Sequence, residues 1–187
     1  MVEAAAVVSP MRERILEAAE HVVADVGAAQ LTLDVVAHAA GVSKGGLLYH
    51  FPSKESLLGA LAQRYVHSME QCMECAKSSL SEHDRSRDLK ACIIGILGSD
   101  PRSKAMGAAL LATAANDLTL LEVIRERIAA YTRELAASNA EFARAAIVTL
   151  AVDGLMMRES LRISPFSDTQ RELIVKELLK IADECYR

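Results

Sequence analysis

A segment early in the chain, GVSKGGLLYHFPSK at residues 41–54, combines phosphate-binding residue types with an unusual density of glycine. A serine followed by a lysine occurs twice, as Ser43-Lys44 and Ser53-Lys54. Serine caps helices, so each pair brings free backbone N–H groups and an ammonium group together at a helix start, an arrangement that binds anions. Tyr49 and His50 add hydrogen-bond donors suited to phosphate. The segment therefore predicts a phosphate-binding surface.

Two short helices are expected around this segment, at residues 33–40 and 44–51, each preceded by a capping Thr or Ser. Gly41 permits a tight turn between them. Two short helices joined in this way form a helix-turn-helix, whose second helix lies in the DNA major groove. Gly45 and Gly46 each weaken that helix by about 1 kcal/mol relative to Ala, but they allow its first turn to approach DNA closely.

The predicted DNA-binding residues lie in and beside this pair of helices. Leu47 belongs to the set by position, although its apolar side chain is expected to face the core, as is that of Phe51. The full set is Thr32, Ser43, Lys44, Gly45, Gly46, Leu47, Tyr49, His50 and Lys54.

Charge limits how strongly this surface attracts DNA. The 187-residue chain has a net charge of −4, and residues 1–60 contain four basic and seven acidic residues. No acidic residue lies between Asp34 and Glu55, whereas Lys44 and Lys54 both do. We therefore expect few phosphate contacts and a shallow salt dependence, with a slope of log K against log salt of about −0.9 per phosphate neutralised.

The composition predicts an all-α fold of about nine helices. The chain is 51% apolar and only 4% aromatic, and no strand-like alternation persists for more than a few residues. We expect a loose arm at residues 1–9, a helix-turn-helix domain at 10–56 and a helical domain at 57–187. Beyond the two short helices, the expected helices are residues 10–26, 53–80, 88–97, 102–115, 118–137, 140–163 and 168–186.

Residues 31–61, LTLDVVAHAAGVSKGGLLYHFPSKESLLGAL, resemble the DNA-binding region of TetR/AcrR-family transcriptional regulators. The resemblance extends from about Met11 to Met69, a third of the chain, and departs from the family pattern at Gly46 and Leu48. It implies a homodimeric protein that binds a double-stranded DNA operator and a small-molecule effector. It further implies that the last two helices form the dimer interface.

The sequence of residues 140–163 independently favours an interface. Its apolar residues do not fit one helical face, so this helix needs cover on several sides. The last helix carries an apolar stripe, and its pairing with a second copy would form a four-helix bundle. The predicted interface residues are Ile147, Leu150, Ala151, Leu155, Ile174, Leu178, Ile181 and Cys185.

Candidate effector-binding residues are adaptable apolar side chains, together with two polar residues in apolar surroundings, Asn116 and Asp153. Each of these residue types also occurs in ordinary cores and interfaces. The set is Met69, Met73, Met106, Asn116, Tyr131, Phe142, Asp153 and Met156.

These observations predict a ligand-responsive transcriptional regulator of the cytoplasm, acting as a repressor by family resemblance, with no catalytic site, metal or cofactor. No transmembrane run or signal peptide is recognisable. One alternative is a thiol- or metal-responsive sensor that uses Cys72 and Cys75. This C-x-x-C lies within an expected helix, however, and that position favours an interpretation as buried structural thiols. A remoter alternative is a helical enzyme or carrier with an incidental helix-turn-helix.

Overall fold

The computed structural model describes residues 9–26, 31–114 and 121–186, which form nine α-helices and no strand. This confirms the predicted all-α class. The helices are α1 (Pro10–Val26), α2 (Leu33–Ala39), α3 (Lys44–His50), α4 (Lys54–Ser78), α5 (Arg87–Leu97), α6 (Pro101–Ala114), α7 (Glu122–Ala137), α8 (Phe142–Ser160) and α9 (Asp168–Glu184). The predicted arm at residues 1–9 lies outside the described residues except for Ser9.

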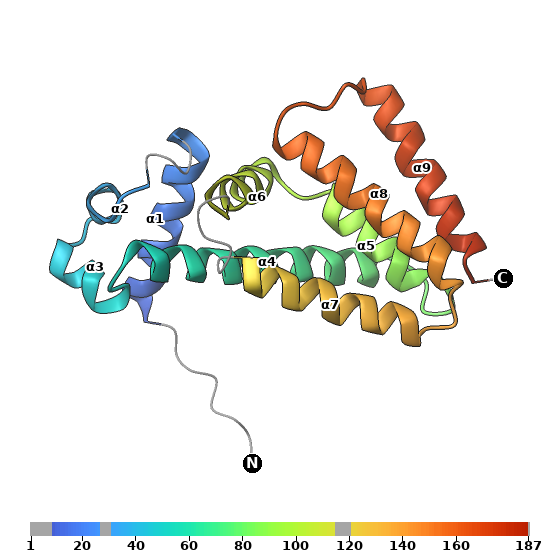
Figure 1. The fold of residues 1–187 in the computed structure, drawn as a ribbon, viewed down its shortest axis with the longest axis horizontal. Helices are drawn as coiled ribbons and strands as arrows, with labels where there is room; N and C mark the ends of the chain where they lie inside the picture. Colours follow the sequence, from blue (N-terminus) through green and yellow to red (C-terminus); the bar gives the residue numbers. More distant parts are fainter. Residues whose placement is uncertain (1–8, 27–30, 115–120, 187) are drawn as a thin grey trace, which may run out of the picture.

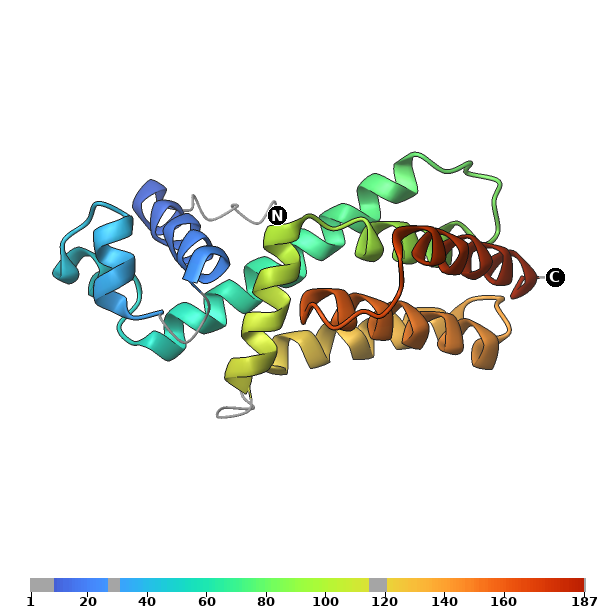
Figure 2. The same ribbon diagram turned by 90° about the horizontal axis from the view of Figure 1, so that it is seen from above.

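Helix α4 runs along the length of the molecule and connects its two ends (Figure 1). It begins beside α3, and its C-terminal half pairs closely with α5. Gly95 permits this close pairing, because a Cβ atom at that position would lie only 2.7 Å from the Cα atom of Met73. The view from above shows α6 crossing between the two ends of the molecule (Figure 2).

Two hydrophobic cores lie at opposite ends of α4. The first contains apolar residues of α1, α2, α3 and the N-terminal half of α4, such as Ile15, Val36 and Leu61. Met106 and Leu110 of α6 also belong to this first core. The second core is built from α5, α7, α8 and α9. Helix α6 therefore fastens the N-terminal helices to the rest of the protein.

Helix α8 ends three residues before the predicted residue 163. Arg162 adopts φ +56°, and the amide of Ile163 donates to the carbonyl oxygen of Arg158 at 2.9 Å. Glycine is the residue that usually adopts this left-handed conformation at the end of a helix. Because an arginine adopts it here, the sequence contains no obvious signal for the end of α8. Among the described residues, no helix is both long and apolar enough to span a membrane.

Candidate nucleic-acid interface and effector cleft

The turn between α2 and α3 has the predicted helix-turn-helix geometry. Gly41 adopts φ +63°, a conformation that side chains disfavour. The amide of Gly41 donates to the carbonyl oxygen of His38 at 3.1 Å, and that of Val42 donates to the carbonyl oxygen of Ala37 at 3.0 Å. These bonds close the C-terminal end of α2 and direct the chain into α3.

Both helices of the pair begin with a hydroxyl cap. The Thr32 side chain accepts a hydrogen bond from the amide of Val35 at 3.2 Å, and the Ser43 side chain accepts one from the amide of Gly46 at 3.1 Å. Each cap satisfies a backbone donor that the helix itself cannot. Contact of Thr32 and Ser43 with DNA remains a prediction.

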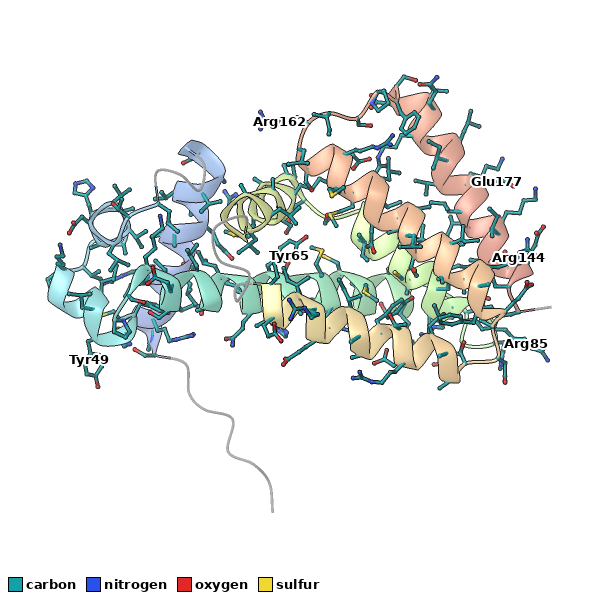
Figure 3. All side chains as sticks on the ribbon, in the orientation of Figure 1. Tyr49, Tyr65, Arg85, Arg144, Arg162 and Glu177 are labelled. Carbon is teal, nitrogen blue, oxygen red and sulfur yellow. The ribbon has the colours of Figure 1, made fainter. Side chains whose placement is uncertain are left out.

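The side chains of α3 divide into a buried side and an exposed side. Leu47 is fully buried in the first core, so it cannot contact DNA, and its inclusion in the DNA-binding set is corrected. Tyr49 is 85% exposed and points away from the body of the protein (Figure 3). The ring of His50 packs edge-on against Tyr49, with centroids 5.1 Å apart. Gly45 is exposed and Gly46 is half-buried.

The two lysines of the segment lie at helix starts, as predicted. Lys44 is exposed at the first position of α3, where its Nζ atom lies 2.9 Å from Oδ1 of Asp34 in the first turn of α2. Lys54 is half-buried and is the first residue of α4, after a capping box formed by Ser53 and Ser56. The interface thus presents an ammonium group at two helix N-termini.

A cleft of about 550 Å³ lies between α4, the start of α5, α7 and the end of the chain. Met73 and Tyr131 from the predicted effector set line it. The remaining lining residues are His67, Glu70, Gln71, Glu74, Lys77, Asp88, Leu89, Ala91, Arg127, Glu134, Leu135, Ser138 and Tyr186.

Ion pairs across the cleft join its walls. The Nε atom of Arg127 lies 2.6 Å from Oε1 of Glu70, and its guanidinium lies over the Tyr131 ring. The Nζ atom of Lys77 lies 2.6 Å from Oδ1 of Asp88. Charged groups therefore rim a cleft whose deeper residues include apolar side chains, a lining suited to a small molecule with both characters.

The other predicted effector residues do not line this cleft. Met69 is half-buried on α4, and Met106 is buried in the first core. Phe142 and Asp153 are exposed on α8. The sulfur of Met156 accepts a hydrogen bond from the Tyr65 hydroxyl at 3.9 Å, and Figure 3 shows Tyr65 above the middle of α4. Asn116 lies outside the described residues.

Partly buried polar groups lie close to Tyr131. Burial raises the pKa of the Cys92 thiol to about 11, and that thiol is hydrogen-bonded to the Tyr131 hydroxyl. Burial also raises the pKa of the Tyr131 phenol. At neutral pH the thiol and the phenol therefore remain protonated.

Most of the polar residues that line the cleft are absent from the predicted effector set. His67, Glu70 and Glu74 recur at helical spacing along α4, so a polar stripe beside the methionines was a usable signal. Arg127 and Tyr186 carried no such signal, because only the tertiary fold brings them beside α4.

A second cleft, of about 720 Å³, lies between α1, α4 and the start of α6. Arg64 of α4 lies in it and forms ion pairs with Glu13 and with Glu20 of α1, the latter at 2.8 Å. The desolvation that accompanies partial burial raises the pKa of the Glu20 carboxyl. This guanidinium thus ties the first helix of the N-terminal end to α4.

The predicted interface residues fall into exposed and buried groups. Ile147 and Leu150 are 64% and 68% exposed on α8, and Ala151 is also exposed. Ile174 and Ile181 are half-buried against the second core. Leu155, Leu178 and Cys185 are buried in that core, so their own protomer already covers them, and they are corrected to core residues.

The four cysteines differ in their exposure to solvent. Cys72 is half-buried and Cys75 is exposed, whereas Cys92 and Cys185 are buried. Within the described ranges, no group of three or more His, Cys, Asp or Glu side chains is placed to hold a metal ion. The structure therefore adds no support to a metal-responsive site at Cys72 and Cys75.

A capped and exposed helix-turn-helix, joined by a long helix to a larger helical domain, defines a DNA-binding transcriptional regulator. Two family descriptions match the chain. Residues 15–61 match the bacterial regulatory proteins of the tetR family, and residues 87–183 match the tetracyclin repressor-like C-terminal domain. The chain belongs to the TetR family of transcriptional regulators.

Curated relatives and a solved structure agree with this family. The HTH-type transcriptional regulator BetI of Serratia proteamaculans is 26% identical over 170 residues, which is 85% of each chain. The HTH-type transcriptional regulator EthR of Mycobacterium tuberculosis is 28% identical over 121 residues, 63% of this chain and 56% of EthR. SCO1917 of Streptomyces coelicolor, a TetR-family member, has the same fold, with a TM-score of 0.70 and 24% identity over 90% of this chain and 98% of its own.

Proposed function

We propose that this protein is a homodimeric repressor whose two α3 helices enter successive major grooves of a near-palindromic operator. A small-molecule effector would release the protein from that operator. The observation that carries the proposal is the outward-facing surface of α3, where Tyr49 and Lys44 are exposed while Leu47 anchors the helix in the core. Paired half-sites about 34–36 Å apart are what two such helices require.

The exposed face of α8 supports dimerisation. Ile147, Leu150, Met157 and Leu161 are all exposed apolar residues and recur at helical spacing, with Gly154 between them. A continuous apolar stripe on a helix surface is typical of a protein interface. We therefore propose that α8 packs against the α8 of a second copy, with α9 beside it completing a four-helix bundle.

Helix α4 supports the proposed effector response. Its first turn carries Lys54 beside α3, and its later residues from His67 to Lys77 line the 550 Å³ cleft. An effector bound there would contact the same helix that positions the DNA-binding end. Such a ligand releases DNA only if it binds the DNA-incompetent state more tightly than the DNA-bound state.

We also propose residues 10–56 as the DNA-binding domain and 57–187 as the effector-binding and dimerisation domain. The helices of the first range carry the capped helix-turn-helix, and those of the second contain the cleft and the exposed α8 face. The first core also includes residues of α4 and α6, so the two proposed domains share buried contacts.

An in vitro selection of random duplex DNA on the purified, ligand-stripped protein tests the proposal. We expect enrichment of a near-palindrome, and we expect Tyr49→Ala with Lys44→Ala to abolish that enrichment. Selection of one unpaired half-site would contradict the dimeric arrangement. A selection without any enrichment, repeated after unfolding and refolding to remove retained ligand, would contradict sequence-specific DNA binding.

A further inference from the structure

The first observation is an exposed ion pair within the helix-turn-helix. The Nζ atom of Lys44 lies 2.9 Å from Oδ1 and 3.1 Å from Oδ2 of Asp34, so both carboxylate oxygens hold one ammonium group. The side chains of Lys44 and Asp34 are 60% and 69% exposed. Among the described residues, no other ion pair involves either of them.

Stability does not account for this pair. Exposed ion pairs contribute little to stability, because water screens the charges and two long side chains must be held in place. The pair nevertheless joins the first turn of α2 to the first residue of α3, the two helices whose relative position defines the motif. The main effect of the pair is therefore to fix the position of the Lys44 side chain and to neutralise its charge.

The location of Asp34 is costly for a DNA-binding surface. It lies two residues after the capping Thr32, in the first turn of α2, and the first helix of such a motif crosses the DNA backbone. A carboxylate there repels phosphate. Residues 1–60 contain only four basic residues, so this one carboxylate offsets a quarter of their charge.

We propose that Asp34 is a positioning residue for sequence-specific DNA binding, which holds Lys44 in one orientation and prevents it from following phosphates of arbitrary sequence. This inference rests on the proposed function. At the operator, Lys44 makes its contact from the position in which Asp34 holds it. At other sequences, Lys44 reaches a phosphate only by leaving Asp34 exposed beside the negatively charged backbone.

This arrangement has a consequence for salt dependence. When a lysine neutralises a phosphate, counterions are released, and each such contact contributes about −0.9 to the slope of log K against log salt. While Lys44 stays paired with Asp34, it makes no such contact. If Lys44 leaves, the exposed carboxylate repels the neighbouring phosphates and offsets the attraction that Lys44 gains. Non-specific binding by the natural protein therefore gains almost nothing from Lys44.

The test compares Asp34→Asn, Lys44→Gln and the double variant with the natural protein. Fluorescence anisotropy at several salt concentrations measures binding to the duplex enriched by selection and to a scrambled duplex of equal composition. The matched control is Glu17→Gln, which removes one exposed carboxylate from α1. Thermal melting establishes that each variant is folded, and we expect the Asp34→Asn midpoint to shift by no more than a few degrees.

We expect Asp34→Asn to tighten binding to the scrambled duplex by roughly three- to tenfold and to steepen its salt slope by about 0.9. Affinity for the enriched duplex should change less. The specificity ratio, which is the affinity for the enriched duplex divided by that for the scrambled duplex, should therefore fall. The steeper slope should be absent when Lys44→Gln is also present, because the effect acts through Lys44. Asp34→Glu, which keeps the negative charge, should retain most of the specificity ratio of the natural protein.

Two results would overturn the inference. In one, Asp34→Asn leaves both the slope and the specificity ratio unchanged. In the other, its effect equals that of Glu17→Gln and persists without Lys44, which would show only the loss of a negative charge. A failure of the proposed function would look different, because the natural protein itself would then not distinguish the enriched duplex from the scrambled one.

Discussion

At the scale of single residues, α3 contains two nearby residues of which one is buried and the other is exposed. Leu47 and Tyr49 are two positions apart, which places them about 200° apart around the helix axis. Leu47 is fully buried, whereas Tyr49 is 85% exposed. The first therefore holds the helix in place, and the second is available to a partner.

Replacement of these two residues by alanine should separate folding from DNA binding. We expect Leu47→Ala to lower the free energy of unfolding by about 2–5 kcal/mol, because it leaves a cavity in the first core. Tyr49→Ala should leave that free energy within about 0.5 kcal/mol of the natural value while weakening binding to the selected duplex. Urea denaturation and anisotropy measure the two effects, and a large loss of stability in Tyr49→Ala would show that its side chain has a packing role.

The thiols supply a second prediction at this scale, a loss of stability in alkaline solution. Burial raises the pKa of Cys92 from its ordinary value of 9.0 to about 11. The folded state therefore binds this proton more tightly than the unfolded state does. The contribution to stability is complete below about pH 9 and is lost as the pH rises towards 11.

We therefore expect the free energy of unfolding to fall between about pH 9 and 11, and to fall less in Cys92→Ala. Alkylation followed by mass spectrometry gives an independent check, because only the thiolate reacts readily. At pH 8, exposed Cys75 should be modified well before buried Cys92. Equal rates for the two thiols in the folded protein would contradict the burial of Cys92.

At the scale of elements, the contact between α4 and α5 depends on one residue without a side chain. A Cβ atom at Gly95 would lie 2.7 Å from both the Cα and the amide nitrogen of Met73. Backbone atoms cannot move aside as a flexible side chain can. The two helices would therefore have to separate, which would disturb the wall of the 550 Å³ cleft that contains Met73.

Gly95→Ala is accordingly expected to destabilise the protein by about 1–3 kcal/mol. Gly59→Ala is the matched control, since it changes another helical glycine around which a Cβ atom would meet nothing within 4 Å. There the substitution should stabilise the helix by about 0.5–1 kcal/mol. Thermal or urea unfolding of the two variants decides the matter, and equal effects would mean that α4 and α5 are not in close contact.

At the scale of the whole molecule, one copy of the chain leaves the apolar face of α8 exposed. Leu150, at 68% exposed, lies near its centre, between Ile147 and Gly154. Burial of such a stripe removes apolar surface from water at about 25 cal/mol per Å². The oligomeric state and the paired recognition of DNA should therefore depend on the same residues.

Leu150→Asp should convert the dimer into a monomer, because it places an unpaired charge in the proposed interface. Binding to the near-palindrome should weaken much more than binding to a single half-site. Ile128→Asp is the matched control, as Ile128 is an apolar residue of similar exposure, 56%, on a different helix, α7. Sedimentation measures the effect, and a dimer that persists in Leu150→Asp would place the interface elsewhere.

Local signals were sufficient to predict most of the helices and the helix-turn-helix. The caps Thr32, Ser43 and Ser53 and the turn at Gly41 each act within a few residues, so their outcome could be predicted from the chain itself. The end of α8 was predicted less well, because Arg162 adopts a left-handed conformation that is uncommon for arginine.

The sequence by itself determined the helical class, the helix-turn-helix and the presence of a second apolar face on α8, since all three follow from local capping and periodicity. Only the tertiary structure decided which apolar residues are buried. Periodicity shows that a helix has two faces to cover, but not that Leu155 enters the second core while Leu150 remains exposed. The cleft proposed for the effector was likewise decided by long-range packing, which brings Arg127 and Tyr186 beside α4 although no local pattern connects them.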